Sequence, residues 1–216
     1  MSHRSLADDR WYWENLHEYS ERASEPVYPT HIFDEREGDA VSEDLFGVYQ
    51  DTWAASRVLR QKPPWLLDVG GTARYVAFLS LFLPVTLVDV RETGLTLGNL
   101  TFTQGDVTAL PFEDDSAPMV SCLSVIEHIG LGRYGDAIDP SGAERACSEL
   151  QRVLAPGGRL LVSAPVGDTV QTHFNMHRVL TPEQIEAWLP ACDLVNGAEV
   201  RSENLRVWCA EFVKHG

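Results

Sequence analysis

The sequence of 216 residues is short of basic residues, of cysteine and of long apolar runs. Lys and Arg number 17 against 32 Asp and Glu, which gives a net charge of −15. A nucleic-acid-binding surface needs clustered Lys and Arg. We therefore expect no nucleic-acid partner and take small-molecule chemistry as the starting hypothesis.

The four cysteines form no C-x-x-C pair and are widely spaced, at Cys122, Cys147, Cys192 and Cys209. This spacing favours buried thiols in a reducing compartment over a disulfide framework or a zinc site, and we predict no metal. The most apolar stretch, residues 76–88, is too short to cross a bilayer and is broken by Pro84. The N-terminus has no apolar signal region. We therefore expect a cytoplasmic protein with no membrane partner.

What is present divides the chain into two regions, residues 1–62 and 63–216. The first is polar, acidic and aromatic, with helices expected over residues 6–19 and about 42–60 and an acidic loop between them. It has too few apolar residues for its own core, so we expect a helical cover that packs on the main domain. The cluster Trp11-Tyr12-Trp13 has two interpretations, a lid over a ligand or helix-to-core packing.

Short apolar strands alternate with helical patterns in residues 63–216. The expected strands are 65–69, 85–89, 100–104, 119–124, 159–163, 193–200 and 205–213, and the expected helices are 73–83, 142–154 and one that opens at Thr181-Pro182. Continuous apolar strands that alternate with helices predict a mainly parallel sheet covered on both faces. The fold class is therefore α/β, Rossmann-like, with seven strands and an N-terminal helical extension.

A ligand site is expected beyond the carboxyl ends of the strands, where the strand order switches. The first strand ends in the turn Asp68-Val-Gly-Gly-Thr72, and glycine lets a backbone approach a ligand closely. Asp89 ends the second strand, where a carboxylate can accept hydrogen bonds from both ribose hydroxyls. A tight turn and a strand-end Asp without any ligand is the alternative on these residues alone.

Three later segments narrow the choice: GDVTALPFEDDS from Gly105, SVIEH from Ser124 and RVLAPGGRLLVS from Arg152. In this order, after Asp68-Val-Gly70 and Val88-Asp89, they resemble the class I S-adenosylmethionine-dependent methyltransferases over residues 65–165. A nicotinamide dehydrogenase shares the glycine turn and the acid but not the later segments. The resemblance implies a Rossmann-like methyltransferase fold, S-adenosyl-L-methionine as cofactor and methyl transfer as the activity.

The resemblance also assigns the cofactor to the ends of the first four strands. The implied cofactor-binding residues are Asp68, Gly70, Gly71, Thr72, Asp89, Val90, Asp106, Val107 and Ser124. Among them, Asp89 corresponds to the acid that holds the ribose, and Asp106 with Val107 to the position that reads the adenine amino group. Two features depart from the family pattern. Thr72 and Arg74 replace the second and third glycines, and residues 91–99 leave little room for the usual helix.

Substrate groups are expected in the glycine-rich segment 127–142 and in residues 175–178, which together resemble a poorly characterised bacterial group associated with sugar and surface-polysaccharide biosynthesis. The expected substrate-binding residues are Glu127, Arg133, Tyr134, Asn175 and Arg178. Arg133 and Arg178 are candidates for a clamp on a phosphate or carboxylate. Surface ion pairs for the arginines and simple packing for Tyr134 are the alternatives.

A hydroxyl acceptor needs a proton acceptor, and histidine suits that role near neutral pH. The candidate bases are His128 and His177, with a purely structural role as the alternative for each. We predict O-methylation of a small polar acceptor such as a sugar or sugar nucleotide, and a homodimer as the candidate assembly. The alternatives are a natural-product methyltransferase acting at oxygen or nitrogen, and a catalytically degenerate binding subunit.

Overall fold

The computed structural model describes residues 45–174, 176–201 and 206–216, together with five single positions nearer the N-terminus: Arg10, Trp13, Glu14, His17 and Glu21. The chain divides into two compact units, Met1–Glu43 and Asp44–Gly216. In the first unit the described positions are helical, and Arg10 pairs with Glu14 at 2.6 Å, one helical turn apart. The rest of the predicted first helix and the acidic loop lie outside the described residues.

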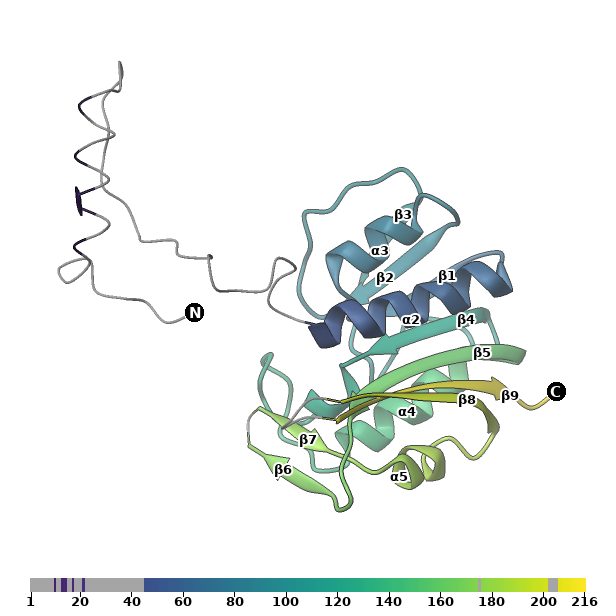
Figure 1. Cartoon of the computed structure of the whole chain (residues 1–216). Helices are drawn as coiled ribbons and strands as arrows, with labels where there is room; N and C mark the ends of the chain where they lie inside the picture. The colour runs from purple at the N-terminus through teal and green to yellow at the C-terminus, as the bar shows by residue number, and fades with distance from the viewer. Residues whose placement is uncertain are drawn as a thin grey trace. The chain divides into compact units, whose positions relative to one another are not determined.

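The second unit is built on a seven-stranded sheet. Its strands are β1 (Leu66–Val69), β2 (Val85–Asp89), β3 (Leu100–Gln104), β4 (Ala117–Leu123), β5 (Leu154–Pro165), β8 (Cys192–Arg201) and β9 (Arg206–Lys214). They lie in the order β3-β2-β1-β4-β5-β9-β8 (Figure 1). Strands β1 to β5 are parallel, and β9 is antiparallel to both β5 and β8. The strand order therefore switches between β1 and β4, near the centre of the sheet.

Helices cover both faces of this sheet, as predicted. They are α2 (Leu45–Gln61), α3 (Ala73–Leu79), α4 (Gly142–Val153) and α5 (Pro182–Ala187). Alternate strand side chains enter two separate cores: Leu66 packs with α2 and α3, whereas the adjacent Leu67 packs with α4 and α5. Figure 1 shows α2 crossing one side of the strands and α4 and α5 on the other. None of the described helices is long and apolar enough to cross a membrane.

Helix α2 belongs to the same compact unit as the sheet, which begins at Asp44 and not at the expected boundary after residue 62. Gln50, Ala54 and Val58 lie one helical turn apart and are all buried. The expected packing of this helix on the main domain is therefore seen. A covering role for residues 1–43 stays a prediction.

Two elements have a boundary four or more residues away from the predicted one. Helix α3 ends at Leu79, and turns carry the chain from Ser80 to Pro84, where proline cannot continue a helix. Strand β5 begins at Leu154, five residues before the predicted start. Leu154 pairs with Ala117 and Arg159 with Met119, so the Pro-Gly-Gly segment bulges out of the ladder, with Gly157 at φ +71°.

Smaller elements complete the carboxyl edge of the sheet. The predicted lack of a helix between β2 and β3 is seen in the described segment 90–99. A short 3₁₀ helix, η2 (Ile126–His128), follows β4, and a separate hairpin of β6 (Gln171–His173) and β7 (His177–Val179) follows β5. The sequence interpretation did not include this hairpin.

Candidate functional site

A pocket opens at the carboxyl ends of β1, β2 and β4, where the strand order switches. Its enclosed volume is about 70 Å³, and the pocket is partly open to solvent. Its lining comprises Val69, Gly70, Val88, Asp89, Val90, Arg91, Gly105, Val107, Ser124, Val125, His128, Ile129 and Tyr134. Predicted cofactor, base and substrate residues therefore meet at one place.

The turn after β1 depends on two glycines. Gly70 has φ +68°, and a Cβ there would lie 2.8 Å from the side chain of Val125. A Cβ on Gly71 would lie 2.0 Å from Oδ1 of Asp68. The turn has no room for a side chain at either position, so the backbone of Gly70 itself forms the pocket wall.

The buried side chain of Asp68 holds this turn in place. Its carboxylate is fully buried and accepts hydrogen bonds from Gly71 N at 2.9 Å and from Ser121 Oγ at 2.5 Å. Burial raises the pKa of the Asp68 carboxyl to about 7, against the opposing effect of these hydrogen bonds. Asp68 thus joins β1, β4 and the turn, and is not among the residues that line the pocket.

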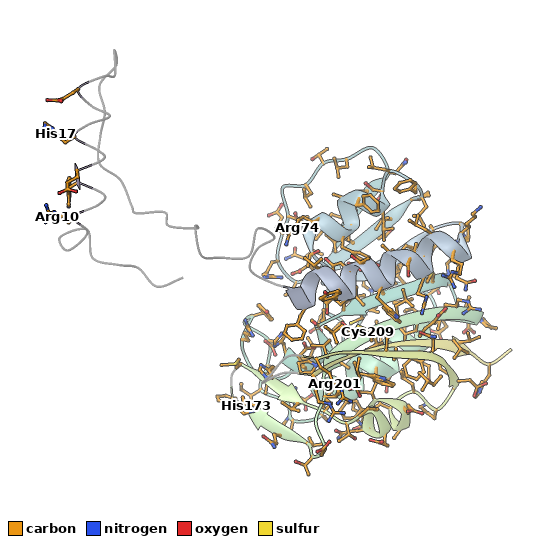
Figure 2. The ribbon with its side chains drawn as sticks, viewed as in Figure 1. Arg10, His17, Arg74, His173, Arg201 and Cys209 are labelled. Carbon is orange, nitrogen blue, oxygen red and sulfur yellow. The ribbon has the colours of Figure 1, made fainter. Side chains whose placement is uncertain are left out.

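Thr72, which stands at one of the family's glycine positions, caps α3. Its Oγ1 accepts a hydrogen bond from Tyr75 N at 3.2 Å and donates one to Asp51 Oδ2 at 2.7 Å. The side chain thereby connects the turn to α2. Arg74, at the other replaced glycine, is exposed at the start of α3 (Figure 2).

Asp89 lies at the end of β2 and is engaged by Arg91. Oδ1 accepts from the Arg91 backbone N and Nε at 2.8 and 2.9 Å, and Oδ2 accepts from Nη2 at 2.8 Å. Burial alone would raise the pKa of the Asp89 carboxyl, but the hydrogen bonds and charge of Arg91 outweigh it and hold the pKa below its ordinary value. The carboxylate is therefore an anion at neutral pH.

The segment after β3 presents backbone and apolar groups to the pocket. Gly105 and Val107 line it, and Val107 is buried. Asp106 instead uses Oδ1 to accept hydrogen bonds from the N and Oγ1 of Thr108, both at 2.8 Å. These bonds fix the loop, and Oδ2 of Asp106 has no hydrogen-bond partner among the described residues.

The chain turns sharply at Ser124, at the end of β4, with φ +53° in a non-glycine residue. Its N donates to Ser163 O at 3.0 Å, and its Oγ donates to Gln50 Oε1 at 2.7 Å. Gln50 also accepts from Ser163 Oγ at 2.9 Å. The sequence interpretation missed Gln50, although a polar residue in register with the apolar Ala54 and Val58 was a usable signal.

His128 follows this turn and is fixed by the β6–β7 hairpin. Its Nδ1 lies 2.7 Å from the carbonyl oxygen of Met176. Because a carbonyl only accepts, Nδ1 carries the hydrogen, which leaves Nε2 as the basic atom of the neutral ring. Burial, assisted by the charge of Arg133, lowers the pKa of His128 below its ordinary 6.5.

Glu127 is the buried neighbour of His128. Its side chain is 2% exposed, and burial raises the pKa of its carboxyl to about 8, so it is largely protonated at neutral pH. Oε1 lies 3.8 Å from His128 Nε2, and Oε2 has no hydrogen-bond partner within the described parts of the chain. Glu127 therefore contributes a neutral carboxyl group behind the base candidate.

The expected substrate residues occupy different environments. Tyr134 is 38% exposed at the pocket, with the guanidinium groups of Arg91 and Arg133 at 4.8 and 5.4 Å from its ring centre. Arg178 is 6% exposed and donates to the carbonyl oxygens of Ile129 and Asp139 at 2.5 and 3.2 Å. Arg178 therefore stabilises the 129–140 loop. This role is neither the anion clamp nor the surface ion pair expected from the sequence.

Two other expected residues lie away from the pocket lining. His177 is on β7, with its ring centre 5.4 Å from that of His173, and Asn175 is outside the described residues. The described residues contain no cluster of three or more His, Cys, Asp or Glu side chains able to hold a metal ion.

Comparisons with known proteins give one family model and several methyltransferases. The model described as "Caenorhabditis protein of unknown function, DUF268" matches residues 113–204, less than half of the chain. The ubiquinone/menaquinone biosynthesis C-methyltransferase UbiE of Brucella anthropi is 27% identical over 164 residues. That match covers 65% of this chain, and the chain spans only 58% of that relative.

Solved structures share the fold at lower identity. The Burkholderia thailandensis 1,6-didemethyltoxoflavin-N1-methyltransferase, crystallised with 1,6-didemethyltoxoflavin and S-adenosylhomocysteine, is 18% identical with a TM-score of 0.63, covering 82% of each chain. The [4+2]-cyclase SpnF is also 18% identical with a TM-score of 0.63, covering 94% of this chain and 93% of its own. The chain has the class I methyltransferase fold, and the predicted fold is confirmed.

The buried carboxyl of Glu127 predicts a specific pH dependence of stability. Its pKa is raised on folding from 4.5 to about 8, so the folded protein retains a proton that the unfolded chain releases. The free energy of unfolding should therefore fall as pH rises from about 5 to 8, by ~2–4 kcal/mol from this group. Asp68 should add a similar loss between its ordinary pKa of 3.8 and about 7.

Urea unfolding of the wild type and of Glu127→Gln at pH 5 and 8 measures this contribution. The variant should lose a large part of the pH dependence, while the exposed-site control Glu183→Gln should keep all of it. Equal pH dependence in the wild type and Glu127→Gln would contradict the prediction.

Proposed function

We propose that this protein is an S-adenosylmethionine-dependent methyltransferase that O-methylates a small polar acceptor. One observation carries the proposal: the pocket at the β1–β4 switch combines an open glycine turn, an ionised strand-end carboxylate and a histidine base candidate within the class I methyltransferase fold. S-adenosylmethionine would supply a methyl group already activated by the positive charge on sulfur.

The pocket residues suit such a cofactor. Gly70 offers backbone without side-chain obstruction, Val107 offers an apolar wall, and Asp89 offers a carboxylate for two ribose hydroxyls. A carboxylate has about four acceptor positions, and Arg91 fills three at Asp89. Binding of both hydroxyls would therefore require Arg91 to release at least one of its hydrogen bonds.

The proton of an acceptor hydroxyl would be taken by His128. Met176 fixes the ring with Nε2 unprotonated, and the lowered pKa keeps that form dominant at neutral pH. The chain's contribution would otherwise be alignment, because methyl transfer is an in-line displacement whose rate depends on the placement of its two partners.

A sugar or sugar nucleotide remains our proposed acceptor, on the resemblance of segments 127–142 and 175–178 to proteins associated with sugar biosynthesis. A natural-product methyltransferase acting at oxygen or nitrogen is the first alternative. A catalytically degenerate binding subunit is the second, since one fold hosts different functions and the [4+2]-cyclase SpnF shares this fold. The base candidate in the pocket lining favours turnover at a hydroxyl over methylation at nitrogen and over a degenerate subunit.

We retain a covering role for the N-terminal region, a homodimer and a cytoplasmic location as proposals. The anchoring of α2 at Gln50 and Asp51 supports the first, because it holds the start of this helix beside Ser124 and the glycine turn.

Removal of the Asp89 carboxylate should weaken cofactor binding. Asp89→Ala loses the acceptor for the ribose hydroxyls, and charge-assisted hydrogen bonds are worth ~1.5–3 kcal/mol each. We expect the Kd for S-adenosylhomocysteine in titration calorimetry to rise by about 10- to 100-fold. Asp193→Ala, at an exposed site on β8, is the matched control. No binding to the wild type would overturn the cofactor assignment itself.

Replacement of His128 should remove turnover without removing the cofactor. Asn at this position can still donate to Met176 O but cannot act as a base, so His128→Asn should lower kcat by about 10²–10⁴ with little change in S-adenosylhomocysteine affinity. The acid limb of kcat/KM in the wild type should lie below pH 6.5, because burial lowers the pKa of His128.

The kcat comparison and the pH profile of kcat/KM both need an acceptor that the protein methylates. Such an acceptor can be found by following S-adenosylhomocysteine release across a panel of sugars, sugar phosphates and nucleotide sugars. His215→Asn, near the C-terminus, is the control and should keep full turnover. Full turnover in His128→Asn would exclude His128 as the base.

A further inference from the structure

The β6–β7 hairpin stands directly beside the pocket. The carbonyl oxygen of Met176, in the hairpin turn, accepts hydrogen bonds from His128 Nδ1 at 2.7 Å and from Arg133 Nη1 at 2.8 Å. The side chains carried by the hairpin are therefore neighbours of the base candidate and of Arg133.

Three cationic or protonatable side chains gather there: Arg133, His173 and His177. The two histidine rings are 5.4 Å apart, and Figure 2 shows His173 on the hairpin. Neither imidazole forms a hydrogen bond or ion pair with a described residue, and Nε and Nη2 of Arg133 are equally free of such partners. Burial, then the charges of His173 and Arg133, lower the pKa of His177, so the three groups repel one another.

None of the described carboxylates forms an ion pair with these three side chains. Asp136 accepts from the backbone N of Gly130, Gly132 and Tyr134. Asp139 is bound to Ser141 and Arg145. Glu127 is buried with a raised pKa, and Asp89 is paired with Arg91. Arg133 and His173 are exposed, so an anion that binds there would meet donor groups that no described carboxylate occupies.

We propose that the acceptor carries a phosphate group, bound by Arg133, His173 and His177 beside the cofactor pocket. The identity of the bound molecule as the methyl acceptor rests on the proposed methyl transfer. The phosphate site itself does not depend on it. A carboxylate would be matched by one guanidinium alone, in a planar two-bond pair. Donors from three separate side chains, one on the 129–140 loop and two on the hairpin, instead suit the several oxygens of a tetrahedral phosphate. The anion clamp expected from the sequence combined Arg133 with Arg178. In the structure Arg178 is not available for it, because its guanidinium donates to backbone carbonyl oxygens.

Titration calorimetry with inorganic pyrophosphate tests the site, in phosphate-free buffer near pH 6.5, with and without saturating S-adenosylhomocysteine. The wild type should bind pyrophosphate saturably, and Arg133→Gln should weaken it at least 10-fold. Arg133→Lys, which keeps the charge but not the planar donor pair, should fall between them. Arg60→Gln, at an exposed arginine near the end of α2, should bind as the wild type does.

Several outcomes would overturn the proposal: no saturable binding, equal weakening in Arg60→Gln, or acetate binding as tightly as pyrophosphate. His177→Gln is the second variant in case Arg133→Gln fails to fold, and it too should weaken binding. Failure of S-adenosylhomocysteine to bind while pyrophosphate does would overturn the methyl transfer and leave the phosphate site standing. Cofactor binding without pyrophosphate binding would overturn the phosphate site alone.

Discussion

The hydrogen bonds of the buried Asp68 carboxylate hold the centre of this molecule together. They join β1 to Ser121 of the neighbouring β4 and to the backbone of the glycine turn, at the point where the strand order reverses. A carboxylate in this environment is costly to ionise, which is why its pKa rises to about 7. The pocket wall formed by Gly70 follows from that turn, since Gly71 can approach Asp68 only because it lacks a side chain.

The second half of the site depends on a less regular set of contacts. Ser124 holds a left-handed backbone conformation because Ser163 and Gln50 bind its polar groups. That turn directs η2 toward the hairpin, where the Met176 carbonyl selects the tautomer of His128. Local strain at Ser124 is thus stabilised by a helix and a strand that are distant in sequence, and its consequence is a correctly oriented imidazole.

Much of the sheet was predictable because its strands are buried on both faces and read as continuous apolar runs; β2 and β3 match their expected bounds residue for residue. The strand-end residues Gly70, Asp89 and Ser124 were predictable from the same logic. The role of Arg178 was not predictable, because its burial depends on the fold of the 129–140 loop. The contact between His128 and Met176 was not predictable either, because it joins residues 48 positions apart. Periodicity reports which face of an element is buried, but not which loop closes on it.

The acidity of the chain and its cationic site are compatible because they act over different distances. At physiological ionic strength the Debye length is about 8 Å, so an approaching anion is only weakly repelled by charges spread over the rest of the surface. Within hydrogen-bond distance, Arg133, His173 and His177 would donate to it directly. Most of the carboxylates nearest to the site are already paired or protonated, Asp89 with Arg91 and Glu127 by burial. A net charge of −15 therefore describes the exterior, whereas the chemistry of the pocket is set by which few charges remain uncompensated there.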